Sequence, residues 1–207
     1  MKKDKIVISL TEFMHFISTS GSAKLTVVKT AKKNRDEEFE TYKDYWKPFR
    51  DALVVMHKKG KSKDVLDDLL NHIPSDKREN YKCAIDGYKK FIGKKKTEWV
   101  NVFKKSWVFE DLSVTLNPEL GLVINDKVYV IKLFFNAKEA LNKRQADLIL
   151  TLLEKELRAK VGGDEVIFAV LDVRRGKLFE MTDKDLKLYP LLQGEAKSFE
   201  TQWKNIE

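Results

Sequence analysis

The sequence is almost without cysteine and has no long apolar run. Cys83 is the single cysteine among 207 residues, so an internal disulfide is excluded and a reducing cytoplasm is the expected compartment. No stretch of about 18 apolar residues occurs, so we expect no membrane span and no membrane partner. The basic start, Met1 to Lys5, is followed by a segment that carries Ser9, Thr11, Glu12 and His15 and lacks a long apolar stretch, which does not fit a signal peptide.

Motifs for nucleotides and for transition metals are also missing. The chain contains neither a P-loop nor the glycine pattern of dinucleotide-binding folds, so no motif supports nucleotide binding. His15, His57 and His72 lie far apart, without the spacing of a metal site, and we expect surface or capping roles for them. Cys83 is interpreted as a helix packing residue.

Positive charge is present in excess, and it is unevenly spread. The formal net charge is +8; residues 1–111 hold 25 Lys and Arg against 17 Asp and Glu, whereas residues 112–207 hold 15 of each. A one-sided positive field attracts polyanions such as nucleic acid. The alternative is a lysine-rich solvated surface without a specific partner. Charge alone does not separate these two interpretations.

The first half of the chain has the apolar spacing of helices. Ser9 and Glu12 form a capping-box pattern ahead of a short helix, and residues 23–33 are a second helical candidate. Further helices are predicted at 42–59, 62–73 and 75–92, with Pro48 near the start of the first and Gly93 ending the last. We therefore predict a helical, basic N-terminal region over residues 1–96.

The second half changes to a mixture of strands and helices. A short helix is predicted at 97–105, followed by strands at 112–116, 120–125 and 127–135, with Asn125-Asp126 as the hairpin turn between the last two. A long amphipathic helix at 137–160 precedes a nearly continuous apolar strand at 166–173 and its hairpin partner at 177–180. Residues 97–207 thus predict an α/β (α+β) domain with a mixed sheet.

This order of elements, α-β-β-β-α-β, resembles the core of the PD-(D/E)XK superfamily of restriction-endonuclease-like nucleases over residues 97–180. In that family an acid stands at the start of the second strand, and a second acid and a lysine stand two residues apart on the third. Pro118-Glu119 falls at the first position and Val130-Ile131-Lys132 at the second. The resemblance implies a Mg²⁺ or Mn²⁺ ion held by Glu119, with Lys132 assisting the attacking water.

The chain also resembles a bacterial family of uncharacterised proteins, which brings no established activity. The resemblance depends on three phrases: Asn-Pro-Glu-Leu-Gly at 117–121, Tyr-Val-Ile-Lys-Leu at 129–133 and Leu-Asp-Val-Arg-Arg-Gly-Lys-Leu-Phe at 171–179.

Val130 departs from the nuclease pattern because it occupies the position of the second acid. One carboxylate holds Mg²⁺ weakly, and magnesium sites in proteins often use two. Glu139, or less favourably Asp147, could supply the missing metal ligand from the following helix, and Asp126 ranks lower because it lies in the turn. Without a substitute, Glu119 and Lys132 could form a plain ion pair. Lys132 could also point outward, with its ammonium group in water.

Basic residues at the junction of the two halves are candidates for contacting phosphates, and paired arginines follow the last buried strand. The predicted nucleic-acid contacts are Lys89, Lys90, Lys94, Lys95, Lys96, Lys104, Lys105, Arg174 and Arg175. Two functions follow. The first is a nucleic-acid-binding protein with a divergent or inactive metal-dependent nuclease core. The second is a non-catalytic protein-interaction or assembly module.

Overall fold

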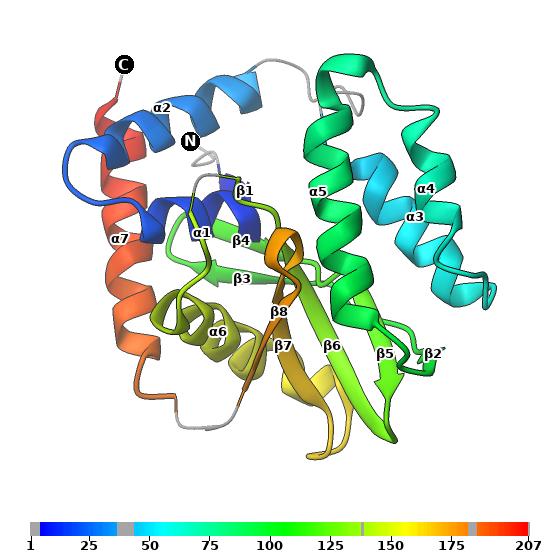
Figure 1. The fold of residues 1–207 in the computed structure, drawn as a ribbon. Helices are drawn as coiled ribbons and strands as arrows, with labels where there is room; N and C mark the ends of the chain where they lie inside the picture. Colours follow the sequence, from blue (N-terminus) through cyan, green and yellow to red (C-terminus); the bar gives the residue numbers. More distant parts are fainter. Residues whose placement is uncertain (1–4, 37–43, 138, 182–185, 207) are drawn as a thin grey trace.

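A computed structural model describes residues 5–36, 44–137, 139–181 and 186–206, and these form two β-sheets with helices packed on both sides (Figure 1). The predicted α/β class with a mixed sheet is confirmed. The larger sheet has the strand order β2-β5-β6-β7-β8 and the smaller has the order β1-β4-β3. Among the described residues, no helix is both long enough and apolar enough to cross a membrane.

The larger sheet combines a meander with a crossover. Its strands are β2 (Thr97–Trp99), β5 (Leu120–Ile124), β6 (Lys127–Phe134), β7 (Ile167–Asp172) and β8 (Lys177–Glu180). β2, β5 and β6 pair antiparallel in turn, helix α6 (Lys143–Val161) then crosses over, and β7 pairs parallel with β6. β8 returns antiparallel to β7 through the short 3₁₀ turn η2 (Val173–Arg175).

The smaller sheet joins the N-terminal strand to a hairpin from the middle of the sequence. Its strands are β1 (Ile6–Ser9), β4 (Leu112–Leu116) and β3 (Lys105–Phe109). β1 pairs parallel with β4, which makes a hairpin with β3. The strand at 112–116 is therefore correctly predicted as a strand, but it lies outside the larger sheet. The strand next to β5 in the larger sheet is β2, and the helix predicted over 97–105 is therefore wrong. β2 is short and its conformation comes from pairing with β5, which local periodicity does not reveal.

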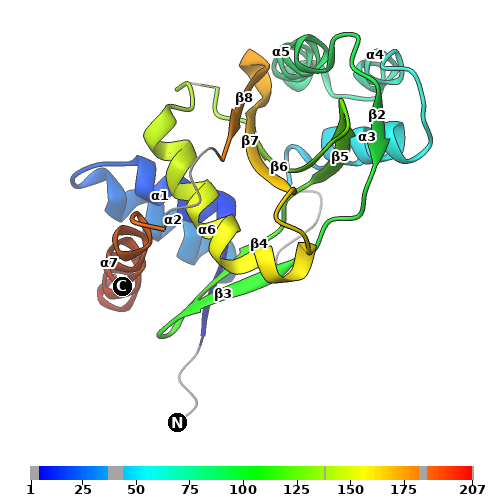
Figure 2. The same ribbon diagram turned by 90° about the horizontal axis from the view of Figure 1, so that it is seen from below.

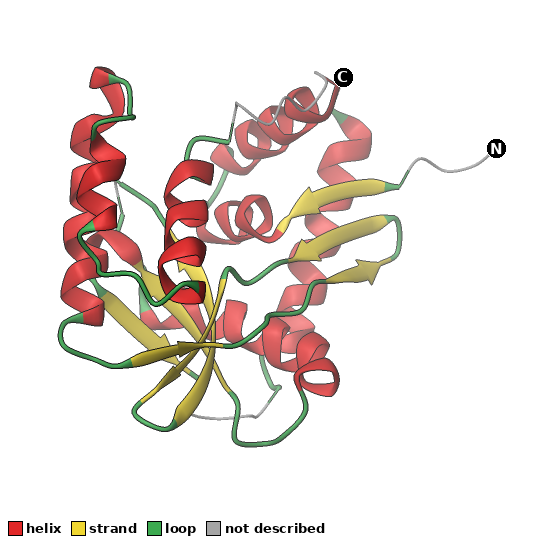
Figure 3. Ribbon diagram, turned by 90° about the vertical axis from the view of Figure 1, so that its right-hand side faces the viewer, coloured by secondary structure: helices red, strands yellow, loops and turns green. Residues whose placement is uncertain are grey.

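The helices divide into two groups on opposite faces of the larger sheet (Figure 2). One group is α1 (Leu10–Ser18), α2 (Ala23–Asp36), α6 and α7 (Tyr189–Asn205). The other is α3 (Lys47–Lys58), α4 (Val65–Leu70) and α5 (Ser75–Ile92). Each group covers its own apolar cluster, and both clusters combine residues from either side of position 96. The colouring by secondary structure in Figure 3 shows the smaller sheet extending from the helices of the first group.

Local signals place several boundaries correctly. The Ser9 hydroxyl accepts from the Glu12 N–H at 3.1 Å and the Glu12 carboxylate accepts from the Ser9 N–H at 2.8 Å, which confirms the capping box. Asn125 and Asp126 have φ of 51° and 63°, as a tight hairpin turn requires. Helix α6 begins at Lys143 behind its N-cap Asn142, and the predicted start at 137 is therefore wrong.

Candidate functional site

Glu119 is positioned by the first bond of the β5–β6 ladder. Its N–H donates to the carbonyl of Ile131 at 3.1 Å, one step before Leu120 pairs with Ile131. This bond fixes Glu119 beside Lys132, at the end where β6 finishes and β5 begins. The second strand of the β2-β5-β6 meander is therefore preceded by the acid, and its third strand carries the lysine.

Lys132 and Glu119 meet in a buried ion pair. Lys132 Nζ lies 2.5 Å from Glu119 Oε1, and the Leu133 N–H donates to Glu119 Oε2 at 2.8 Å. Only 2% of the lysine side chain and 10% of the glutamate side chain are exposed. An outward-pointing Lys132 is thus excluded, and both carboxylate oxygens have a donor. A buried ion pair adds little to the free energy of folding compared with apolar residues of equal size. Removing one partner is strongly destabilising, because it leaves an unpaired charge in the interior.

Val130 lies on the same face of β6 as Lys132, as residues two apart on a strand must. It is 3% exposed and belongs to the apolar cluster beneath α6. Its partner across the ladder is Gly121 on β5. The position at which the nuclease resemblance implies a second acid therefore carries a buried apolar side chain.

The acids considered as substitutes lie in three different settings. Glu139 is exposed in the segment before α6, where its N–H donates to the side chain of Asn136 at 3.1 Å. Asp147 is on α6 and pairs with Lys143. Asp126 is in the β5–β6 turn, at the opposite end of the two strands from Glu119. Across the described ranges, no three His, Cys, Asp or Glu side chains converge as metal ligands. A single carboxylate with both oxygens bonded does not fit a catalytic Mg²⁺ or Mn²⁺ ion.

Asp172 is a second buried acid that the sequence prediction missed. It is the last residue of β7, 1% exposed, and pairs in register with Phe134, two residues beyond Lys132. Its carboxylate accepts from the Leu141 N–H at 3.1 Å and pairs with Arg175 at 3.2 Å. Asp172 thus fixes the approach to α6. A lone acid ending an otherwise apolar strand was the available signal.

The two arginines predicted to contact phosphate have partners within the protein. Arg175 bonds Asp172 and the carbonyl of Asn136, and Arg174 donates to the side chain of Asn80 on α5 at 3.0 Å. These bonds connect η2 to α5 and to the segment after β6. Their part in nucleic-acid binding stays a prediction.

The predicted lysines differ in their surroundings. Lys89 pairs with Asp67 and Lys105 pairs with Glu156, at 2.5 and 2.7 Å. The remaining five are exposed, namely Lys90, Lys94, Lys95, Lys96 and Lys104. Most of the exposed group therefore gathers at the end of α5 and in the turn that leads to β2.

His57 forms a buried polar connection on the other side of the larger sheet. Its two ring nitrogens lie 2.5 Å from the Tyr88 hydroxyl and 3.0 Å from the Thr97 hydroxyl, which joins α3 to α5 and β2. Burial lowers the pKa of His57 from 6.5 to about 4 and raises the pKa of Tyr88. The neutral imidazole can bond both hydroxyls, one as donor and one as acceptor. The predicted surface or capping role is therefore wrong for His57, because its side chain is buried.

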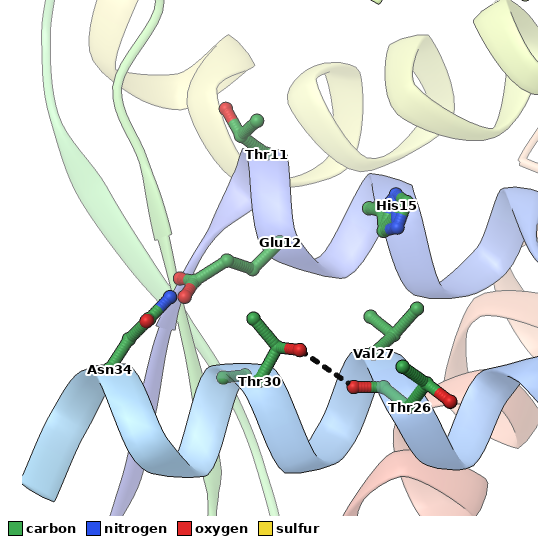
Figure 4. Close-up of a pocket in the computed structure, with 8 residues that line it drawn as sticks. Thr11, Glu12, His15, Thr26, Val27, Thr30 and Asn34 are labelled. Carbon is green, nitrogen blue, oxygen red and sulfur yellow. Dashed lines mark hydrogen bonds between the residues drawn. The ribbon is translucent and has the colours of Figure 1, made fainter. Parts of the chain in front are cut away.

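A shallow groove of about 290 Å³ lies between α1 and α2 (Figure 4). Glu12 and His15 on α1 face Thr30 and Asn34 on α2 across it. The Glu12 carboxylate is already committed to the cap of α1, and the Thr30 hydroxyl donates to the carbonyl of Thr26. Two of the polar side chains that line the groove are therefore already bonded within the protein.

Comparison with the known protein families and with curated protein sequences finds no match to this chain.

Proposed function

We propose that this protein is a nucleic-acid-binding protein built on a PD-(D/E)XK-like core that does not cleave its ligand. The element order α5-β2-β5-β6-α6-β7 supports the core, since it reads α-β-β-β-α-β once the β3–β4 hairpin between β2 and β5 is set aside. Glu119 and Lys132 stand at the positions of the acid and the lysine in that order.

The closed ion pair is the observation that carries the non-hydrolytic part of the proposal. A nuclease centre needs carboxylate oxygens free for a metal and a lysine free to reach the water. Here the two side chains neutralise each other, and Val130 keeps the neighbouring position apolar. The role of the pair is therefore structural: it connects the start of β5 to β6 in the interior of the protein.

Nucleic-acid binding is supported by the net positive charge of the chain and by the exposure of its lysine side chains to solvent. The net charge is +8, and five of the predicted lysine contacts are exposed. Lysine ammonium groups neutralise backbone phosphates and release counterions, which gives sequence-independent binding that weakens steeply with salt.

A cleavage assay tests the proposal. Fluorescently labelled DNA and RNA, each single-stranded and duplex, are incubated with the protein and Mg²⁺ or Mn²⁺, and the fragments are separated on a denaturing gel. We expect full-length strands throughout, with the protein and with a Glu119→Gln/Lys132→Met control.

Metal-dependent fragments from the parent that disappear in the double variant would contradict the proposal and identify Glu119 and Lys132 as catalytic. Fragments made equally by both proteins would place cleavage elsewhere and also contradict it. A parent protein that binds no nucleic acid at low salt would favour the protein-interaction alternative.

A further inference from the structure

Two lysine-rich turns that are about thirty residues apart in sequence meet at one place in the fold. Helix α3 ends at Lys58 and is followed by Lys59, Lys61 and Lys63. Helix α5 ends at Ile92 and is followed by Lys94, Lys95 and Lys96. Figure 1 shows α3 and α5 both finishing on the side of the molecule where β2 lies.

Contacts between the turns hold them together. Lys63 Nζ donates to the carbonyl of Gly93 at 3.2 Å, and Lys58 Nζ lies 5.2 Å from the centre of the Trp99 ring on β2. The half-buried bond between His57 and Thr97 joins the end of α3 to β2. The relative position of the two turns is thus fixed by the core.

The resulting surface carries most of the excess charge of the protein. Residues 58–64 and 89–98 contain nine lysines and two acids, and Asp67, which pairs with Lys89, lowers the local difference to +6 within a chain of net charge +8. We define the lysine surface as the exposed members of this set: Lys58, Lys59, Lys61, Lys63, Lys90, Lys94, Lys95 and Lys96. Only its α5 half is evident from the clustering of lysines along the sequence.

Stabilisation of the helix ends explains only part of this arrangement. Lysines near a helix C-terminus satisfy its last carbonyls and complement its dipole. Lys63 does this for Gly93 and Lys95 does it for Phe91. Within the described chain, the side chains of Lys59, Lys61, Lys94 and Lys96 make no hydrogen bond or ion pair, and their ammonium groups remain available to an external anion.

We infer that the lysine surface is where the protein holds double-stranded nucleic acid, through the phosphates of its backbone. This inference rests on the proposed function and specifies its ligand. Lysine is a point charge without the planar fork that reads base edges, so contact is made irrespective of sequence. Trp99 is half-buried and covered by Lys58, so it is not free to stack on an unpaired base.

The test compares two variants with equal charge loss. One changes Lys59, Lys61, Lys94 and Lys96 to Gln. The control changes four exposed cations on β1, α2 and α6 or next to them, namely Lys5, Lys29, Arg35 and Arg144, to Gln. Fluorescence anisotropy measures affinity for a labelled DNA duplex and a labelled RNA duplex over a range of salt concentrations. Thermal melting followed by circular dichroism confirms that each variant is folded.

The lysine-surface variant is expected to bind more weakly, with a slope of log K against log salt that is smaller by about 2 to 4, since each lost phosphate contact removes about 0.9. The control variant should keep a slope within about 1 of the parent. Equal losses in the two variants, or parent-like binding by the lysine-surface variant, would overturn the inference while leaving the proposed function in place. A parent that binds neither duplex at low salt would overturn the inference, and one that binds no single strand either would also overturn the proposed function.

Discussion

At the scale of single residues, the main feature is the buried ion pair between Glu119 and Lys132. The Lys132 ammonium is nearly inaccessible to water, and Glu119 supplies its charged partner, while Leu133 satisfies the other carboxylate oxygen. Burial of two charges is tolerated because each satisfies the other. The pair consequently favours one register of β5 against β6, since a shift by one residue would move the lysine to the opposite face.

The ion pair gives a prediction for stability. Changing Lys132 to Met leaves the Glu119 carboxylate buried without a counter-charge, and we expect a loss of about 3–5 kcal/mol in the free energy of unfolding. Adding Glu119→Gln removes that charge and should recover most of the loss. Urea denaturation of the parent, the single variant and the double variant measures this. A single variant within about 0.5 kcal/mol of the parent would show that the pair has no structural role.

His57 gives a prediction for pH. Its pKa is lowered from 6.5 to about 4 in the folded protein, so the unfolded chain binds more protons between these values. The contribution of His57 to stability is therefore complete above pH 6.5 and is lost as the pH falls toward 4, by no more than about 3 kcal/mol.

Denaturation of the parent and of His57→Gln at several pH values checks this prediction. Glutamine does not titrate, so the advantage of the parent over the variant should shrink as the pH falls through this window. Stability curves that run parallel from pH 7 to pH 4 would contradict the assigned role.

At the scale of elements, α5 and η2 touch backbone to backbone. A Cβ atom at Gly87 would lie 2.0 Å from the carbonyl oxygen of Val173, and one at Gly176 would lie 2.5 Å from the carbonyl oxygen of Gly87. Only glycine at both positions permits this approach. The contact places the turn between β7 and β8 against α5, where the Arg174 side chain donates to Asn80.

Alanine substitution tests this helix contact with an internal control. Gly87→Ala is expected to cost at least about 1–3 kcal/mol, because backbone must move to relieve the overlap. Gly194→Ala on α7 has open space around the new methyl group and should stabilise the protein by up to about 1 kcal/mol through helix propensity. Thermal or urea unfolding compares them. Equal effects of the two changes would show that the close approach of α5 is absent in solution.

Elements with strong local signals are predictable from this sequence, and those made by tertiary pairing are not. The capping box at Ser9, the hairpin turn at 125–126 and the apolar strand that became β7 each carry their own signal. β1 and β2 are short and form through distant partners. Helix α7 has no counterpart among the elements predicted from the sequence, although Leu192, Ala196 and Phe199 have helical spacing.

The candidate site follows the same rule. The meeting of Glu119 with Lys132 is predictable, because the hairpin turn sets the register of β5 and β6. The roles of Asp172 and Arg175 are not, because they depend on a crossover helix and a 3₁₀ turn. The α3 half of the lysine surface is likewise missed, since it requires two helices to end side by side.

At the scale of the whole molecule, the interior and the surface have separate roles. The charges inside the fold are paired, as with Lys132 and Asp172, and the excess positive charge lies on an exposed surface fixed by two helix ends. Under the proposed function, a core without an open carboxylate centre, joined to such a surface, holds a polyanion without cutting it.

Titration of a labelled duplex with the parent protein in low salt and Mn²⁺ tests this account most directly, with the strand length in each sample checked on a denaturing gel. We predict a saturating rise in anisotropy that added salt reverses, and strands of full length at every protein concentration. An anisotropy that never rises, or strands shortened in proportion to the protein added, would contradict it.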